Sequence, residues 1–400
     1  MFSGGRCLFF LVLSPSLAAS TFPRPKEMGF RQQIGEWVDV RVLNPYAVRS
    51  WNEDRRVNHS FVVLAEHRSI TDLLTGRANK LRPESGFFRI GSSSLNDSQV
   101  SEGSKSARRI LLETRSSRQG TAGDVLARHL GSPSGFFTRG FGHLLVADYF
   151  STFIALDRPP EVTDLVNRYI LESLIPDDVR RRSLRRYAAL PRLRRALTGL
   201  LEHADHRNPS QDLVDVALAA AKDKEDAAEL FQRLVLATAG FTGAALEWLF
   251  VHSAWHHGLY SPRDFVLESL RMSSVACRLT RVAEYPTHTA GISILPGDQI
   301  LLNIYAANRD EAAWSSPTDF LPERWSTEIG ERRNISFGKG KRVCPAQNAA
   351  IEALIDFRQV IEANYGVRFF KLPLSRSRVG TLIAPPNGYV SVRPKKTLRD

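Results

Sequence analysis

The spacing of hydrophobic and polar positions predicts helices over most of the chain after about Phe141. Apolar residues recur there at three- and four-residue intervals, or run almost continuously, over 142–156, 161–175 and 212–255. The last stretch is too long for one ordinary helix. We therefore expect a turn near Lys222–Asp226, followed by a long interior helix over 226–255. Shorter helices are predicted after Asp264 and after Cys344.

Other segments carry strand and turn signals. Residues 281–305 combine β-branched residues with proline and glycine and predict short strands. Residues 380–394 predict a hairpin closed by Pro385-Pro386-Asn387-Gly388. The serine-rich stretch 91–107 predicts a loop, with a helix starting near Ala107. Together these patterns favour a mainly α fold with small β-sheets, an α+β layout.

Composition and charge narrow the class of protein. Hydrophobic residues make up 43% of the 400 and charged residues 24%, as in globular proteins. The net charge of +12 favours an acidic partner. The arginines between Arg180 and Arg195 are either one solvated helix face or a docking patch. Without a recognition motif, no nucleic-acid partner is expected.

Three cysteines, Cys7, Cys277 and Cys344, are too few for a disulfide framework and indicate a reducing, intracellular compartment. The first 20 residues resemble a signal peptide or a membrane anchor, with Arg6 before a short apolar run. That run is too short to span a bilayer. A cleaved leader, a weak anchor and a buried segment all remain open. Residues 21–85 show no clear period.

Cys344 lies directly after a glycine-rich loop and before an alanine-rich helix. The start of a helix offers unpaired N–H groups that stabilise a thiolate. Gly338 and Gly340 allow the backbone to approach a flat ligand closely, and Arg342 could pair with a carboxylate. These residues alone also fit a buried structural cysteine.

Three motifs around Cys344 resemble the cytochrome P-450 superfamily. F-G-K-G-K-R-V-C-P-A is similar to its heme-binding loop F-x-x-G-x-R-x-C-x-G, with Ala346 in place of the last glycine. Upstream lie E-x-x-R and F-x-P-E-R-F/W patterns in the expected order. The resemblance implies heme b, with Cys344 as the axial iron ligand and Phe337, Gly340, Arg342 and Arg281 around the heme. It also implies a buried network of Glu268, Arg271 and Arg324.

Other segments depart from the family pattern. Its central-helix motif A/G-G-x-D/E-T corresponds to Ala239-Gly240-Phe241-Thr242-Gly243, which lacks the acid–alcohol pair. Gly240 and Thr242 are the catalytic candidates there, and a helix kink with core alanines is the alternative. Trp51 and Arg55 match the family's W-x-x-x-R, but residues 86–113 also look like the strand and helix that should precede it. We therefore predict a P-450-like domain over 86–400, incomplete or divergent in its N-terminal half.

The resemblance implies a monooxygenase that oxidises a small lipophilic substrate in specialised metabolism. It would use O2 and electrons from NADPH through a flavoprotein reductase docked near Lys339 and Lys341. Its N-terminus would associate with the endoplasmic reticulum membrane. The expected pocket is lined by Ala239, Gly240, Thr242, Val275–Leu279 and Thr381–Leu382.

Two alternatives stay open. The missing acid–alcohol pair favours a heme-thiolate peroxygenase, isomerase, dehydratase or oxidative cyclase. The short N-terminal half favours a non-catalytic relative. His256-His257 invites a metal interpretation, but a pair at a helix end fits better because no ligand lies at a suitable spacing.

Overall fold

The computed structural model describes residues 53–58, 60–76, 81–83, 95–113, 121–130, 134–138, 140–173, 192–326, 333–373, 377–379 and 382–395. The N-terminal leader, Trp51, Thr381 and the arginines from Arg180 to Arg186 therefore lie outside the described residues.

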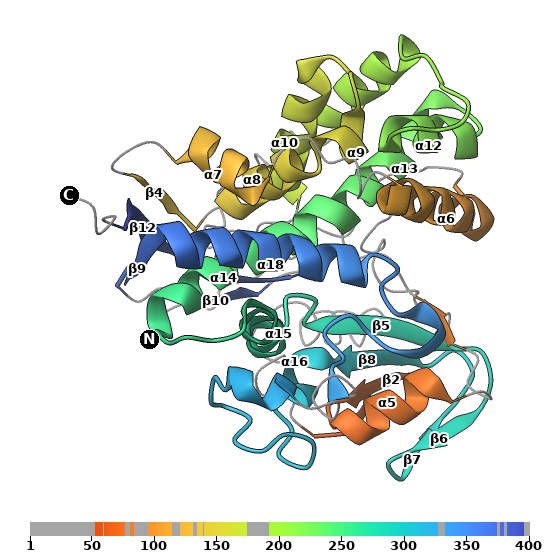
Figure 1. Cartoon of the computed structure of the whole chain (residues 1–400). Helices are drawn as coiled ribbons and strands as arrows, with labels where there is room; N and C mark the ends of the chain where they lie inside the picture. Colours follow the sequence, from red (N-terminus) through yellow and green to blue (C-terminus); the bar gives the residue numbers. More distant parts are fainter. Residues whose placement is uncertain are drawn as a thin grey trace, which may run out of the picture.

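Two parts of the molecule meet at a pair of long helices (Figure 1). A helical part lies above, a part with the largest sheet lies below, and α14 and α18 run between them. The helices are α5 (His67–Thr75), α6 (Asp97–Glu113), α7 (Ala122–His129), α8 (Phe141–Tyr149), α9 (Ser151–Ala155), α10 (Pro160–Ser173), α12 (Leu213–Ala220), α13 (Lys224–Val235), α14 (Phe241–Trp255), α15 (Pro262–Ser273), α16 (Ile304–Ala307) and α18 (Gln347–Asn364).

Four small sheets complete the described fold. A five-stranded sheet has the order β1 (Arg55–Asn58), β2 (Phe61–Leu64), β8 (Gln299–Asn303), β5 (Arg278–Ala283) and β3 (Leu81–Pro83). A three-stranded sheet has the order β4 (Ser134–Phe137), β12 (Gly388–Pro394) and β9 (Tyr365–Lys371). Two-stranded pairs are β10 (Ser377–Val379) with β11 (Ile383–Pro386), and β6 (Thr287–Thr289) with β7 (Ile292–Ile294). The predicted mainly α, α+β layout is confirmed.

The five-stranded sheet joins the early part of the chain to the later part. β2 pairs in parallel with β8 along Phe61–Leu64 and Gln299–Leu302. Strands between residues 55 and 83 therefore fold together with the segment that carries the motifs. These strands precede residue 86, the predicted start of the P-450-like domain. Arg55 opens strand β1, and Trp51, the other residue of the W-x-x-x-R match, lies outside the described residues.

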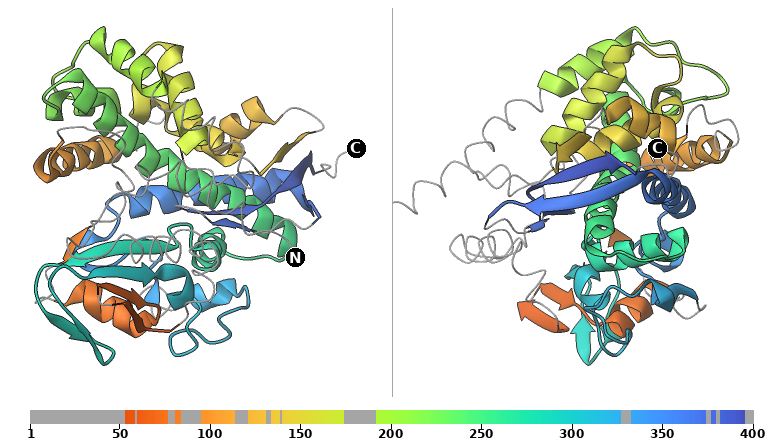
Figure 2. Two further views of the ribbon diagram at one scale, coloured as in Figure 1. Left: turned by 180° about the vertical axis from the view of Figure 1, so that it is seen from behind. Right: turned by 60° about the vertical axis from the view of Figure 1, so that its left-hand side comes forward.

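The long interior helix forms as predicted, with one local change of geometry. α12 ends at Ala220 and α13 starts at Lys224, which confirms the turn. α13 and α14 are joined by the π-helical turn η2 (Leu236–Gly240). The helix from Lys224 to Trp255 is long and apolar enough to cross a membrane, but 83% of its most apolar window is buried inside the fold. It is therefore a core helix here. The left view of Figure 2 shows it running diagonally across the molecule, between the helical part and the part with the largest sheet.

Two predictions from local sequence are wrong. Part of the serine-rich stretch is helical, because Asn96 and Gln99 cap α6 reciprocally: the Gln99 N–H donates to Asn96 Oδ1 at 2.9 Å, and the Asn96 N–H to Gln99 Oε1 at 3.0 Å. The predicted C-terminal hairpin is absent, because β11 pairs with β10 and β12 pairs with β9 and β4. The residues of the predicted turn lead the chain from the two-stranded sheet of β11 to the three-stranded sheet of β12, so they close no hairpin.

Candidate functional site

Cys344 lies at the end of a tight loop next to α18. Its N–H donates to the Phe337 carbonyl at 2.9 Å, which closes the loop. Gly338 and Gly340 have φ values of +74° and +69°, a left-handed conformation that favours glycine. A Cβ on Gly340 would lie 2.3 Å from the Leu74 carbonyl oxygen, so only glycine lets the loop approach α5 this closely. Arg342 ends the short 3-10 turn η4 (Gly340–Arg342), two residues before Cys344.

The electrostatics of the thiol differ from the expectation. The Cys344 side chain is partly buried. Burial raises the pKa of the thiol above its ordinary value, and a hydrogen bond from the Ala346 N–H opposes this effect. The helix start therefore contributes in the expected direction, but desolvation outweighs it. A metal ion bound to the sulfur would have to supply the remaining stabilisation of the thiolate.

Glu268 and Arg271 form a fully buried bidentate pair on α15. Arg271 Nε lies 2.9 Å from Glu268 Oε2, and Arg271 Nη2 lies 2.7 Å from Glu268 Oε1. Arg324 Nε donates to the same Glu268 Oε1 at 3.1 Å. The structure therefore brings together the three residues of the predicted network.

Further groups that the sequence analysis missed complete this network. Trp325 Nε1 donates to Glu268 Oε2 at 2.9 Å, and the Leu321 N–H donates to Glu268 Oε1 at 2.9 Å. Arg271 Nη1 donates to the carbonyls of Asn308 at 2.7 Å and Pro317 at 2.8 Å. A buried ion pair costs desolvation energy, so this degree of hydrogen bonding is what makes it tolerable.

Asn308 connects the network to the loop that holds the thiol. Its side-chain Nδ2 donates to Ser274 Oγ and to Ser336 Oγ, each at 3.1 Å. Ser336 directly precedes Phe337, whose carbonyl accepts the bond from Cys344. The buried network thus fixes the start of the loop.

The same stretch also anchors α5. Asp310 Oδ2 accepts the His67 N–H at 2.8 Å at the first residue of α5. The carbonyl of Leu74, at the other end of that helix, is the group that Gly340 approaches. The motif A-N-R-D therefore orients two of the elements around the cysteine loop.

The expected pocket segments converge on the long helix. The Ile383 N–H donates to the Val275 carbonyl at 3.0 Å, and Trp248 Nε1 on α14 donates to the Ile383 carbonyl at 2.9 Å. Leu382 is fully buried next to this contact. The segment after α15, the segment before β11 and Trp248 on α14 thus lie side by side.

Gly240 ends the π-helical turn, and Thr242 follows it on α14. Both are buried, Thr242 with 7% of its surface exposed. A π-helical turn in an α-helix often marks a functional position. On the same turn, Thr238 is partly exposed and its hydroxyl donates to the Leu234 carbonyl at 2.9 Å. Thr238 is a second hydroxyl that the motif comparison did not single out.

Gly243 occupies the position of the family's threonine, and it has no room for a side chain. A Cβ there would lie 2.6 Å from the His143 Cα atom on α8. Gly243 therefore allows a close contact between α14 and α8, and a threonine at this position would displace α8.

Arg281 on β5 is largely buried, with 8% of its surface exposed, and its Nη1 donates to the Thr280 carbonyl at 2.8 Å. His256 ends α14, as expected for a helix-end pair, and stacks on Phe320 with ring centroids 4.1 Å apart. Within the described part of the chain, no group of three or more metal-ligating side chains occurs. That leaves the Cys344 thiol as the candidate metal donor from the sequence analysis.

Comparison with known proteins agrees with this site. The family described as "Cytochrome P450" matches residues 263–354. "Ent-kaurene oxidase-like 5" of Oryza sativa subsp. japonica is 35% identical over 94 residues, which is 22% of this chain and 19% of the relative. "Cytochrome P450 3A11" of Mus musculus is 33% identical over 127 residues, 30% of this chain and 25% of the relative. The chain thus matches about a fifth to a quarter of the length of these relatives.

Solved structures extend the likeness to most of the fold. The retinoic acid-bound cyanobacterial CYP120A1 has a TM-score of 0.67 at 14% identity, covering 90% of this chain and 96% of its own. CYP109B1 from Bacillus subtilis has a TM-score of 0.65 at 17% identity, covering 86% and 97%. At the level of the fold, the expected incompleteness of the N-terminal half is therefore not seen.

The fold and the thiol loop define a heme-thiolate class of protein. Residues 263–354 match the cytochrome P450 family, and the described fold resembles solved P450 structures. The cofactor of that family is heme b, and the residues present fit it. They offer a thiol at the end of a loop with two left-handed glycines, a buried cationic Arg281, and small residues on a π-helical turn of the central helix.

Proposed function

We propose that this protein is a heme-thiolate monooxygenase that oxidises a small lipophilic substrate with O2 and electrons from NADPH. The observation that carries the proposal is the continuous hydrogen-bonded path from the Glu268–Arg271–Arg324 network through Asn308 and Ser336 to the loop of Cys344. The heme supplies the oxidation chemistry when it is bound.

The chain's own residues would hold and orient that group. Cys344 would hold the heme iron through its sulfur, and a thiolate ligand would tune the heme for oxidation chemistry. Arg342 and Arg281 are the proposed partners of the propionates, because a guanidinium binds a carboxylate with paired hydrogen bonds. Phe337 and Gly340 shape the loop beside the ring.

Opposite the cysteine loop, across the heme, the π-helical turn would form the groove for oxygen and substrate. Gly240 keeps the groove open, and Thr242 is the proposed donor of a proton to bound oxygen. Thr238, partly exposed on the same turn, is the second candidate. Buried apolar residues along α14 would exclude water from the substrate.

Relatives named as hydroxylases support this class of reaction, among them "Geraniol 8-hydroxylase" of Swertia mussotii, 33% identical over 95 residues, 22% of this chain and 19% of the relative. We infer a specialised biosynthetic role and a flavoprotein reductase as electron donor. The reductase would dock near Lys339 and the exposed Lys341, close to the proximal loop. Membrane association through the N-terminus remains a part of this proposal.

A second function is favoured by one observation. The close contact between Gly243 and α8 excludes the family's alcohol from its usual position. This supports a heme-thiolate peroxygenase, isomerase, dehydratase or oxidative cyclase, which does not need the same delivery of protons to O2.

Turnover assays distinguish the two functions. The heme-loaded protein would be supplied with a panel of small terpenoids and phenolics, either with NADPH and a P450 reductase or with peroxide alone. A monooxygenase forms a hydroxylated product only with NADPH, reductase and O2, and 18O from O2 appears in that product. Product formed at the same rate without NADPH and reductase would contradict the proposal and support the second function.

A further inference from the structure

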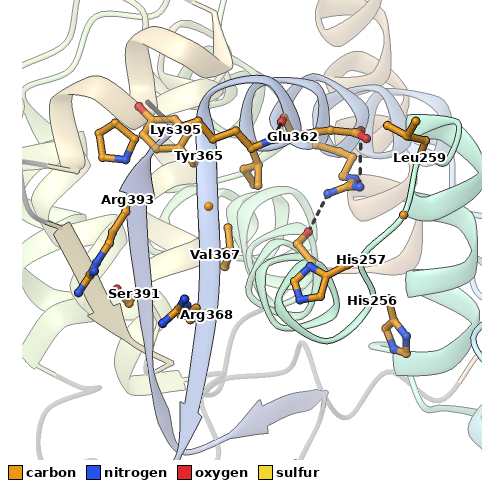
Figure 3. A pocket seen from close by; sticks show the side chains of 16 residues that line it. His256, His257, Leu259, Glu362, Tyr365, Val367, Arg368, Ser391, Arg393 and Lys395 are labelled. Atoms are coloured by element: carbon orange, nitrogen blue, oxygen red, sulfur yellow. Dashed lines mark hydrogen bonds and ion pairs between the residues drawn. The ribbon is translucent and has the colours of Figure 1, made fainter. Parts of the chain in front are cut away.

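A cleft of about 810 Å³ lies between the C-terminal ends of α14 and α18 and the strands β9 and β12 (Figure 3). It is remote from the thiol. Arg358, on its wall, lies 11 residues beyond the start of α18 at Gln347, which is roughly 16 Å along a helix that rises about 1.5 Å per residue. The cleft is therefore a different place from the proposed heme site.

Positive charge dominates the lining of the cleft. Four cationic side chains face one carboxylate there, namely Arg358, Arg368, Arg393 and Lys395 with Glu362. His256 and His257 lie at the other side of the opening (Figure 3). A concave surface lined by one sign of charge concentrates ions of the opposite sign.

Arg358 carries the most informative geometry in the cleft. It is 5% exposed, and its guanidinium lies over the Phe265 ring at 3.9 Å from the centroid. Nη1 donates to Ser253 Oγ at 3.2 Å, and Nη2 lies 3.5 Å from Glu362 Oε2. The buried Nε has no hydrogen-bond partner.

This arrangement leaves a buried cation with an unsatisfied donor. An unsatisfied buried N–H destabilises the folded state. The pair with Glu362 does not neutralise the cleft, because three further cations surround it. An anion in the cleft would offset the excess positive charge, and it would accept from the buried Nε once the guanidinium turns toward the cleft.

The strands beside the cleft add cations to its lining. Along β9, Val367 is buried while the next residue, Arg368, is exposed on the other face of the strand. Arg393 pairs in register with Gly366, which has no side chain to close the edge between them. The lining thus combines one interior guanidinium with several at the surface, which suits a ligand with more than one negative group.

We propose that this cleft binds a small multivalent oxyanion, a phosphate- or carboxylate-bearing molecule, with Arg358 as its inner anchor. The guanidinium would bind an oxygen of the anion through Nε, and the other cations of the lining would bind the second negative group. Such a site would couple the concentration of an anionic metabolite to the stability of α14 and α18.

Binding of two probe anions to the heme-loaded full chain tests the proposal. Inorganic pyrophosphate and citrate would be titrated by calorimetry at constant ionic strength, and Tm would be measured in parallel. We expect saturable binding of at least one probe together with a rise in Tm. The probe that binds more tightly assigns the site to phosphate or to carboxylate chemistry.

Three variants make the test specific. Arg358→Gln should weaken binding at least tenfold. His257→Glu changes an exposed position at the mouth, leaves the interior intact, and should weaken binding several-fold. Arg168→Gln, exposed on α10, is the matched control and should bind like the wild type. The proposal is overturned if the wild type shows no saturable binding, or if His257→Glu and Arg358→Gln both bind as tightly as the control.

Discussion

Gly142 and Gly243 meet where α8 crosses α14, and neither position has room for a side chain. A Cβ on Gly142 would lie 2.2 Å from the Gly243 carbonyl oxygen, and a Cβ on Gly243 would lie 2.6 Å from the His143 Cα atom. The crossing is reinforced by the buried Glu247, whose Oε1 accepts the N–H of Gly140 at 2.6 Å. The departure from the family motif at Gly243 is thus explained by helix packing.

Restoring the family's threonine should therefore damage the protein. Gly243→Thr forces α8 and α14 apart, and overpacking of a tight core site costs about 1–3 kcal/mol. We expect a lower Tm and no gain in turnover. Gly199→Thr, in the helical stretch 192–202 with open space where a Cβ would lie, controls for replacing a helical glycine by threonine. A Gly243→Thr protein with wild-type stability and higher activity would contradict this account of the crossing.

The hydroxyls near the π-helical turn can be separated by substitution. If Thr242 delivers protons, Thr242→Ala should lower the amount of product formed per NADPH consumed, while Thr242→Ser should retain it. Thr238→Ala is the matched variant on the same turn. The ratio of product to NADPH consumed, with peroxide release, measures the effect. Equal ratios in the wild type and both alanine variants would remove the threonines from the mechanism.

The buried ion-pair network should govern both stability and heme retention. Arg271→Lys cannot keep the bidentate pair with Glu268 together with the bonds to Asn308 and Pro317. Lysine keeps the positive charge, but leaving buried hydrogen-bonding groups unsatisfied costs about 1–3 kcal/mol. We expect a lower Tm and a lower heme-to-protein ratio, because Asn308 holds the loop of Cys344. Arg263→Lys, exposed on the same helix, should leave both quantities unchanged. Normal heme content in Arg271→Lys would break the proposed link.

The buried His252 should make the free energy of unfolding depend on pH. It is fully buried between Trp248 and Phe320, and burial lowers its pKa from 6.5 to about 3. Because the folded state holds the neutral form, the stabilisation is present above pH 6.5 and is lost as the pH falls toward 3. Between pH 6.5 and 5 the loss should be about 2 kcal/mol.

Denaturant unfolding at several pH values checks this dependence. His252→Gln, which does not titrate, should reduce the decrease in unfolding free energy below pH 6.5. Substitution of the exposed His257 by Gln should leave the pH dependence as in the wild type. Identical pH profiles for wild type and His252→Gln would contradict the assignment.

The sequence predicted the C-terminal site better than the rest because its contacts are encoded in short motifs. Glu268 and Arg271 lie one helical turn apart, so their pairing follows from local spacing. The contact of Gly243 with α8 and the bond from Asn308 to Ser336 join distant positions, and no local pattern specifies them. Packing also sets the π-helical turn, and it decides that β12, after Asn387, pairs with β4 and β9 rather than with β11. The helix α6 could have been found from the Asn96 and Gln99 cap, which the serine-rich composition obscured.

The central claim is that Cys344 binds heme iron through its sulfur. The most direct test is the absorption difference spectrum of the reduced protein with and without carbon monoxide, for wild type and Cys344→Ser, with Cys277→Ser as the control at the other described cysteine. The account predicts the red-shifted Soret band of a thiolate-bound heme in the wild type and in Cys277→Ser, and its loss in Cys344→Ser. The same band in Cys344→Ser, or no heme spectrum in the reconstituted wild type, would contradict the account.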